Sequence, residues 1–402
     1  MNSPKGTYCP DTSDGKNLIM IEALYNLDNL YEAFLEVKAA SGWKETTQRY
    51  EEDLLFHLLD LHKRLINGTY KPTKPYCFLY NERGKLRLIE SYVIDDRIVQ
   101  WCFVNKVLLP LIRPKLIYDN SASLKGRGTD HFRARLELHL TDFARENSND
   151  GFIVIGDFRK YFDNLRHTVF LQILKELGAD SEVINFAKLL IDAHKIDVSY
   201  MTDEEYAECM NMPFNSIENA LVDATLKTGE KLMDKSMGIG SHIAQIAGVV
   251  YPYRIDNYCK IVKGIKGYAR YMDDFYIIHK SKEFLWELMS ELKKLCAELG
   301  LFLNERKTQI VSLHHPFTIL KTQYRLLPDG RIIRKPDKSQ RIRTCRKLKA
   351  MKAKLDEGTI TLDKVEQIYK STRGQLARYG ETESVRSFDE FYNNLLKIKI
   401  KI

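Results

Sequence analysis

The chain has 402 residues, of which 44% are hydrophobic, and a formal net charge of +8 at pH 7. This length is enough for two or three compact lobes with hydrophobic cores. The mild positive charge permits a polyanionic partner without requiring one.

The seven cysteines are scattered singly, without the paired spacing of a zinc site or a disulfide framework. No apolar run approaches the ~20 residues that a membrane span needs, and the first residues lack the apolar core of a signal peptide. The sequence therefore predicts a protein of the reducing cytoplasm with no membrane partner.

Helices are expected over most of the N-terminal part. Residues 17–66 are predicted to be helical, and LLFHLLDLHKRL at 54–65 places apolar residues on a helical period. CFLYNERGKLRLIE at 77–90 predicts a hairpin, and 93–113 a helix that ends near Pro114.

Strands and helices mix in the middle of the chain. FIVIGDF at 152–158 predicts a strand buried on both faces. Residues 168–195 are expected to be helical, and the acidic stretch 199–236 to be an irregular insertion or lid. GYARYMDDFYIIH at 267–279 predicts strand, turn and strand, with an acid pair at the tip.

A capped amphipathic helix follows this hairpin. Ser281 is the expected N-cap, leucines from 285 to 299 share one face, and Gly300 follows the end. The tail from residue 336 is basic at first and then helical. This mixture predicts an α+β core with a helical C-terminal lobe.

Asp273 and Asp274 form the acid pair, inside an otherwise apolar and aromatic run. Two buried carboxylates are costly without a positive partner, and Mg²⁺ prefers such oxygen ligands. Two-metal phosphoryl transfer needs a further carboxylate, for which Asp157 at the end of the predicted strand is the best candidate. Because a bare Asp-Asp pair is more often a simple turn, this pattern alone indicates only a candidate metal site.

YMDD within GYARYMDDFYII resembles the active-site box of reverse transcriptases, and other motifs follow in that family's order. DFRKYFDNLRH at 157–167 resembles the first catalytic box. The remaining matches are KLRLIE and DDRIVQ within 85–100, YDNSASLKGRGT at 118–129, GIGSHIAQ at 238–245, LGLFLNERKT at 299–308 and FTILKTQYRL at 317–326.

This resemblance covers roughly residues 45–330. It implies a right-hand polymerase fold of fingers, palm and thumb. The expected domains are an N-terminal helical extension with part of the fingers at 1–66, fingers and palm at 67–330, and a basic helical thumb at 331–402.

The resemblance also implies the chemistry. Asp157, Asp273 and Asp274 would be the catalytic residues and would bind two Mg²⁺ ions, with Mn²⁺ as an alternative. One ion would activate the primer 3′-hydroxyl and the other would hold the triphosphate. The implied partners are an RNA template, a DNA or RNA primer and dNTPs.

Phe162 lies five residues after Asp157, at the family's steric-gate position. An aromatic ring there would collide with a 2′-hydroxyl and so select deoxynucleotides. The alternative is that Phe162 and Tyr161 are ordinary core aromatics.

Three cations are expected to bind nucleotide phosphates: Lys85, Arg87 and Arg127. Lys85 and Arg87 are two residues apart, so on a strand they share a face. Arginine forks match phosphate oxygens in bidentate fashion. Each could instead be a solvated surface cation.

GIGSHIAQ occupies the position of the family's nucleotide-pocket glycine motif. Gly240 would let the backbone approach a base pair closely, and Gln245 would donate from its amide. The form resembles that of diversity-generating retroelements and defence-associated enzymes, except that Ala244 stands where those often have serine. Lys307 would protonate the leaving group, or would be a surface lysine at a helix end.

Nucleic-acid contacts are expected in two places. Lys321, in the primer-grip position, would touch primer phosphate. Arg346, Lys347 and Lys349 lie in the basic segment 334–354, where thumb helices would contact the template–primer duplex. A charge run of this kind is otherwise a solvated face.

The leading interpretation is an RNA-templated DNA polymerase, a nucleotidyltransferase, and the alternative is a nucleic-acid-binding protein on a polymerase scaffold. The presence of all three aspartates favours the enzyme. The expected role is to copy a dedicated noncoding RNA in bacterial antiphage defence, and a diversity-generating retroelement enzyme is the alternative role. An accessory protein or a homo-oligomer stays open.

Overall fold

The computed structural model describes residues 21–82, 84–336, 338–377 and 382–396. The chain forms two compact units. The first comprises the described residues within 21–115, 167–199 and 216–246, and the second comprises those within 116–166, 200–215 and 247–396. Both units mix helices with strands or hairpins, so the expected α+β class is confirmed.

The first unit begins with helices, as expected. They are η1 (Ile21–Tyr25), α1 (Leu27–Ser41), α2 (Glu45–Glu52) and α3 (Leu54–Ile66). Leu58, Leu61 and Leu65 are the buried residues of α3, in agreement with the predicted apolar face at 54–65. Residues 17–20 of the predicted helical stretch lie outside the described residues.

The predicted hairpin is formed by β1 (Tyr76–Glu82) and β2 (Lys85–Ser91), paired antiparallel. The helix predicted over 93–113 consists of α4 (Ile94–Cys102), the π-helical turn η2 (Phe103–Leu108), α5 (Leu109–Ile112) and η3 (Arg113–Lys115). The π-helical turn η2 precedes Pro110. Proline has no backbone N–H, and its ring would crowd the carbonyl one turn earlier in a regular α-helix.

The helical character predicted for residues 168–195 is confirmed, and the structure divides the stretch into two helices, α7 (His167–Glu176) and α8 (Ser181–Asp192). Gly178 adopts a φ of 97°, which ends the first helix. The Asp180 side chain then accepts a hydrogen bond from the Val183 N–H at 2.8 Å and caps the second helix.

The stretch 199–236 is not one irregular insertion. It contains α9 (Asp203–Asn211), α10 (Ser216–Ala220) and η5 (Ala224–Leu226). Residues 200–215 belong to the second unit and residues from 216 to the first. Thr202 and Glu205 form a reciprocal capping box that starts α9, a local signal present in the sequence.

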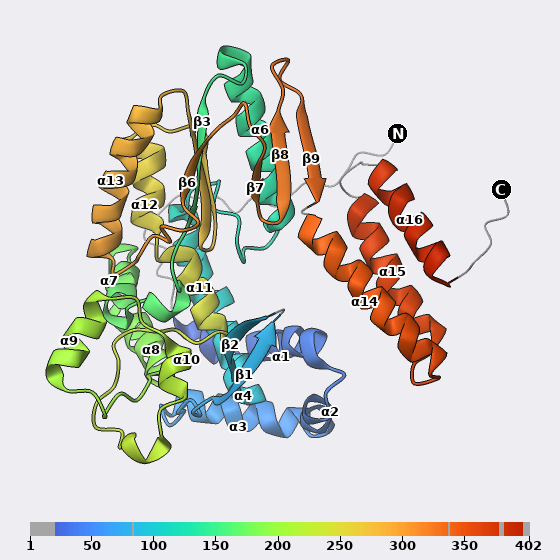
Figure 1. Ribbon diagram of the computed structural model, residues 1–402. Coiled ribbons are helices and arrows are strands. Elements are labelled where there is room, and N and C mark those ends of the chain that lie inside the picture. Colours follow the sequence, from blue (N-terminus) through green and yellow to red (C-terminus); the bar gives the residue numbers. More distant parts are fainter. Residues whose placement is uncertain (1–20, 83, 337, 378–381, 397–402) are drawn as a thin grey trace, which may run out of the picture. The chain divides into compact units, whose positions relative to one another are not determined.

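An antiparallel sheet of four strands organises the second unit. Its order is β4 (Tyr268–Tyr271), β5 (Asp274–His279), β3 (Phe152–Asp157), β6 (Gln309–Ser312). Figure 1 shows this sheet between α6 (Thr129–Asn147) on one side and α12 (Tyr253–Asn257) and α13 (Lys282–Glu298) on the other. The predicted Ser281 cap is confirmed, since its side chain accepts from the Phe284 N–H at 3.1 Å.

A second sheet of three strands follows: β7 (Phe317–Ile319), β8 (Thr322–Leu326) and β9 (Ile332–Pro336). Residues of α6 and of both sheets share one hydrophobic core, which includes Phe132, Leu136, Ile155, Tyr276 and Tyr324. Because α6 spans both sheets, it places the β7–β8 turn and the ends of β3 and β5 around a common space.

Three helices end the described chain: α14 (Lys338–Asp356), α15 (Leu362–Ala377) and α16 (Thr382–Leu396). They enclose their own core of Leu348, Val365, Leu376, Phe388 and Tyr392. The predicted helical tail is thus confirmed. Across the described part of the chain, no helix has both the length and the apolar character required to cross a bilayer.

Candidate active site

Asp157 and Asp274 are direct partners in the antiparallel pairing of β3 with β5. Directly opposite residues project from the same face, with Cβ atoms about 4.5–5.5 Å apart. A two-residue turn joins Tyr271 to Asp274, and Met272 in this turn has a φ of 54°. Positive φ at the first turn position suits the twist of a tight hairpin. Two sequence segments far apart therefore bring their carboxylates together.

Asp157 is only 5% exposed. Its carboxylate accepts hydrogen bonds from Asn304 Nδ2 at 2.8 Å and from Lys307 Nζ at 2.9 Å. The Phe158 N–H donates to the carbonyl of Asp273 at 3.1 Å, which ties the end of β3 to the turn of the acid pair. Asn304 was not singled out from the sequence, although the LNERK motif contains it.

Lys307 places a positive charge 2.9 Å from the carboxylate of Asp157. Burial alone would lower the pKa of Lys307, but the hydrogen bond to Asp157 and the charges of Asp157, Asp274 and Asp273 raise that pKa above its ordinary value. The lysine is therefore held protonated beside the carboxylates. Its side chain is 61% exposed, so it is accessible to a ligand as well.

Arg270 anchors the β4–β5 hairpin from within the core. It was not singled out from the sequence. Its guanidinium donates to Asp256 Oδ1 at 2.8 Å and Oδ2 at 2.7 Å, to the Val249 carbonyl at 2.7 Å and to the Met272 carbonyl at 3.0 Å. Burial would lower the pKa of Arg270, yet the charge of Asp256 raises it. Arg270 thus fixes the backbone of the turn that carries the acid pair.

The donor set of Asp157, Asp273 and Asp274 fits divalent cations in its chemistry. All three offer carboxylate oxygens, and Asp157 already accepts from a cation, Lys307. Among the described residues, no three His, Cys, Asp or Glu side chains are grouped into a metal cage. Mg²⁺ sites commonly use one or two carboxylates together with substrate phosphates and water, so such a cage is not required.

Phe162 and Tyr161 differ clearly in environment. Tyr161 is 4% exposed and its hydroxyl donates to the Gly248 carbonyl at 2.7 Å, so it is a core residue. Phe162 is partly exposed. A Cβ at Gly248 would lie 3.1 Å from the Phe162 ring and 3.3 Å from Met272 Sδ. The Phe162 ring therefore lies beside the hairpin turn, and its role as a steric gate stays a prediction.

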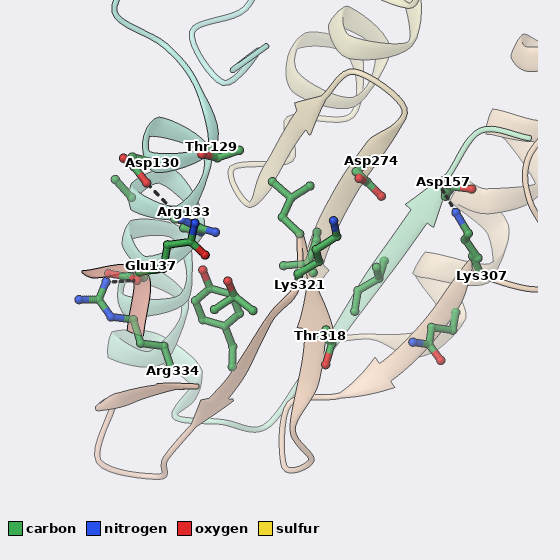
Figure 2. A pocket seen from close by; sticks show the side chains of 18 of the residues that line it. Thr129, Asp130, Arg133, Glu137, Asp157, Asp274, Lys307, Thr318, Lys321 and Arg334 are labelled. Carbon is green, nitrogen blue, oxygen red and sulfur yellow. Dashed lines mark hydrogen bonds and ion pairs between the residues drawn. The ribbon is translucent and has the colours of Figure 1, made fainter. Parts of the chain in front are cut away.

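A cavity of about 1220 Å³ opens next to Asp157 and Asp274. Lys307 and Lys321 also line it, as Figure 2 shows. Lys321 lies in the β7–β8 turn, where Leu320 and Lys321 have φ values of 44° and 61°. Positive φ at both positions is typical of a two-residue hairpin turn. This turn places Lys321 at the cavity that Asp157 and Asp274 also line.

Two arginines that line this cavity were not singled out from the sequence. Arg133 of α6 pairs with Asp130 at 3.1 Å, and Arg334 of β9 pairs with Glu137 at 3.0 Å (Figure 2). Arg133 lies on the amphipathic α6, and only the tertiary fold turns it toward the same space as Lys321. The cavity thus combines carboxylates at one end with cations along its wall.

Lys85 and Arg87 belong to the first unit, whereas the three aspartates belong to the second. Both lie on β2, two residues apart as predicted, with Lys85 exposed and Arg87 half-buried. Arg87 Nε lies 2.7 Å from Glu82 Oε2 across the hairpin. Their binding to phosphate stays a prediction.

Arg127 has a local structural contact. Its guanidinium donates to the carbonyls of Asn120 at 3.0 Å and Ile117 at 3.3 Å, and it lies 5.0 Å from the Tyr118 ring centroid. These contacts hold the loop that precedes α6. A phosphate ligand would have to share this guanidinium with the loop.

The two glycines of GIGSHIAQ pack closely against Glu90, a contact that was not predicted, and their approach to a base pair stays a prediction. A Cβ at Gly240 would lie 2.1 Å from the Glu90 carbonyl oxygen, and one at Gly238 would lie 1.7 Å from the Glu90 carboxylate carbon. Both glycines are thus required by packing against β2. Gln245 is exposed on α11 (His242–Val250), and so is accessible to a ligand.

The basic helix α14 presents Arg346, Lys347 and Lys349 as exposed cations. Leu348, between them, is fully buried in the three-helix core. The helix therefore turns an apolar residue inward and presents these cations to solvent. Contact with nucleic acid stays a prediction.

Comparison with known proteins identifies the family. A family model described as reverse transcriptase (RNA-dependent DNA polymerase) matches residues 71–326, well over half of the chain. Protein YkfC of Escherichia coli (strain K12) is 25% identical over 150 residues, which cover 36% of this chain and 38% of YkfC.

Two solved structures are also similar. Telomerase from Candida albicans, in complex with a TWJ fragment of telomeric RNA, shows a TM-score of 0.43 and 13% identity over 81% of this chain and 59% of that one. Apo telomerase from Candida tropicalis, truncated from its C-terminal domain, shows a TM-score of 0.43 and 13% identity over 65% and 54%. The chain spans less than two thirds of each of these relatives. The family match over residues 71–326 shows that the chain belongs to the reverse transcriptase (RNA-dependent DNA polymerase) family, which has the right-hand polymerase fold.

Proposed function

We propose that this chain is an RNA-templated DNA polymerase that extends a primer with dNTPs. One observation carries the proposal: Asp157 and Asp274 are paired across β3 and β5 at the edge of a cavity of about 1220 Å³ lined by Lys307 and Lys321. Paired carboxylates beside a cation-lined cavity suit transfer of a phosphoryl group between polyanions.

Asp157, Asp273 and Asp274 would hold two divalent cations, with Mg²⁺ first and Mn²⁺ as an alternative. Such ions, when bound, supply activation of the primer 3′-hydroxyl and neutralise charge on the triphosphate. The protein's contribution is to fix the carboxylates. Arg270 does this through the Met272 carbonyl, and Asn304 through Asp157.

Other side chains have separate tasks in this proposal. Lys307, held protonated beside Asp157, can give a proton to the leaving pyrophosphate. Phe162 excludes a 2′-hydroxyl. Lys85 and Arg87 neutralise the triphosphate, and Gln245 donates toward the base pair.

The nucleic acid would be held by cations that carry no sequence information. Lys321 would contact primer phosphate in the cavity beside the aspartates. Arg346, Lys347 and Lys349 would follow the duplex along α14, through phosphate contacts that position the strands. The assignment of residues 331–402 as the thumb is part of this proposal.

Primer extension tests the activity. The purified chain, Mg²⁺, dNTPs and a primed RNA template should yield full-length DNA, and EDTA should stop the synthesis. The Asp273→Asn/Asp274→Asn variant serves as the matched control. If the wild type extends no primer on RNA or DNA templates, while it binds them, the scaffold interpretation replaces the polymerase.

The proposed role is to copy a dedicated noncoding RNA in bacterial antiphage defence, in the cytoplasm. Its support is the IGxxxxQ form of the glycine box, with Ala244 before Gln245. RNA that copurifies with the protein from its host should contain one dominant species, whose sequence appears in the cDNA. A repeat-containing RNA copied with errors at adenine would instead indicate a diversity-generating retroelement, and unenriched cellular RNA would contradict both roles.

A further inference from the structure

Glu90, at the end of β2, is a buried carboxylate outside the proposed catalytic centre. It is 7% exposed. Its Oε2 lies 2.7 Å from His194 Nδ1 and also accepts from the Tyr92 hydroxyl, which lies 2.6 Å from His194 Nδ1. Three polar groups thus satisfy one another inside the first unit. A buried carboxylate of this kind is kept only where its partners compensate its desolvation.

The loop 238–240 packs closely against Glu90. The Glu90 N–H donates to the Ile239 carbonyl at 2.9 Å, as part of a parallel bridge between Ile89 and Ile239. A Cβ at Gly238 would overlap the Glu90 carboxylate, and one at Gly240 would overlap the Glu90 carbonyl oxygen. Both the side chain and the backbone of Glu90 therefore set the position of this loop.

The same group of residues reaches the start of α11. Burial first, and then the charge and hydrogen bond of Glu90, raise the pKa of Tyr92, while a hydrogen bond with Ser241 opposes this rise. Ser241 Oγ in turn accepts from the Ala244 N–H at 3.0 Å, as a cap of α11. A chain of contacts therefore runs from Glu90 to the helix that carries Gln245.

We infer that Glu90 is a positioning residue, which fixes Gly240 and Gln245 at a set distance from Lys85 and Arg87 on β2. This inference rests on the proposed function. A nucleotide that places its triphosphate on the strand and its base at the helix touches both sets. The distance between the two sets then decides how well the whole dNTP binds, because small misplacements of binding groups reduce binding energy strongly. Asp157, Asp273 and Asp274 belong to the second unit, so we expect variants at Glu90 and Gly238 to change KM more than kcat.

A rescue experiment tests the inference. Gly238→Ala should raise KM for dNTPs about tenfold, the size expected when a buried charged hydrogen bond is disturbed, and leave kcat within about twofold. Glu90→Gly alone should also raise KM, because Tyr92 and His194 lose their partner. Added to Gly238→Ala, it removes the carboxylate that the new methyl group strikes, so the double variant should regain part of the affinity lost in Gly238→Ala and stay below the wild type. Gly238 does not need positive φ, so its backbone accepts alanine.

Gly240→Ala is the matched control. Its added Cβ strikes the Glu90 carbonyl oxygen, and Gly240 has a φ of 134°. Glu90→Gly cannot relieve either problem, so Glu90→Gly/Gly240→Ala should stay impaired. Equal rescue of both alanine variants, or rescue of neither, would overturn the inference.

Two volume-conserving variants test the contacts of Glu90 while both glycines stay unchanged. Tyr92→Phe and His194→Gln should speed amide hydrogen exchange in residues 239–241 about tenfold or more, because Glu90 loses a partner. Unchanged exchange would overturn the inference. If the wild type makes no DNA, the proposed function fails and this exchange result alone decides the role of Glu90. If the wild type makes DNA and the rescue fails, only the inference on Glu90 fails.

Discussion

Arg270 and Asp256 form an ion pair of 2.7 Å in which the side chains are 0% and 1% exposed. The arginine precedes the acid pair in the hairpin, and it also donates to the carbonyl of Met272 in the turn. The buried pair therefore supports the turn from within the core. Tyr268 adds a hydroxyl donor to Asp256 at 2.6 Å, so the carboxylate is well satisfied.

Asp256→Asn should destabilise the fold strongly. It leaves the buried guanidinium of Arg270 without its counter-charge, a change that costs about 3–5 kcal/mol of unfolding free energy. Urea denaturation followed by circular dichroism measures this loss. Arg49→Ala breaks an exposed pair with Glu45 and should change stability by less than about 0.5 kcal/mol. Equal losses in both variants would contradict the importance of the buried pair.

Asp273→Asn combined with Asp274→Asn should abolish dNTP incorporation and leave the fold intact. Both residues lie at the hairpin tip and are only partly buried. The double variant should therefore lose metal ligands while the hydrophobic core stays intact. Primer extension in Mg²⁺ and the thermal melting temperature are the two measurements. Asp150→Asn, at a side chain that is 91% exposed, is the control and should keep full activity. Substantial synthesis by the double variant would refute the assignment of the active site.

The sequence was sufficient to predict β3, the β4–β5 hairpin, the Ser281-capped α13 and the helical tail, since these have clear local patterns. Helix α6 and the strands β6 to β9 were not predicted. The sequence also placed Asp157 at a strand end and the acid pair at a hairpin tip. It could not give the register that pairs Asp157 with Asp274, because register depends on contacts between strands.

Arg270 and Asp256 show what the sequence hides. They are separated by 14 positions and follow no helical or strand period, so only the tertiary fold reveals their pairing. Gly240 shows a different limit. Its glycine was predicted as a close approach of the backbone, and the structure adds an approaching group that was not predicted, Glu90, 150 positions earlier. Approach to a base pair stays a prediction.

Phe162→Ala should raise incorporation of ribonucleotides relative to deoxynucleotides. The ring is partly exposed beside Gly248 and the hairpin turn, so its removal opens space without emptying the core. Competition between a dNTP and the matching rNTP in single-nucleotide extension gives the ratio. Tyr161→Phe removes only the hydroxyl bonded to Gly248, and should cost about 1 kcal/mol of stability while leaving this ratio unchanged. An unchanged ratio in Phe162→Ala would place the gate elsewhere.

Lys307→Met should increase the affinity for a divalent cation when no nucleotide is present. The ammonium group of Lys307 lies 2.9 Å from Asp157 Oδ1 and competes with a cation for that oxygen. Titration with Mn²⁺ followed by electron paramagnetic resonance measures the change. The same variant should slow dNTP incorporation, because it lacks the proton donor. Lys293→Met, whose lysine pairs with Glu305, is the control. Equal Mn²⁺ affinity in Lys307→Met and the wild type would show that Lys307 does not compete.

Neutralising Arg346, Lys347 and Lys349 together with glutamine should weaken binding of a template–primer duplex in a salt-dependent way. All three are exposed on α14 and turned away from its apolar core, so the fold should survive. Each lost phosphate contact lowers the slope of log affinity against log salt by roughly 0.7 to 0.9, so the slope should fall by about 2 to 3. Fluorescence anisotropy between low and moderate salt measures it. Glutamines at Lys280, Lys293 and Lys294 remove the same net charge from exposed sites elsewhere, and should leave the slope nearly unchanged. Equal slopes for the two triple variants would show that net charge alone explains the binding. In that case α14 would be a solvated basic face without specific phosphate contacts.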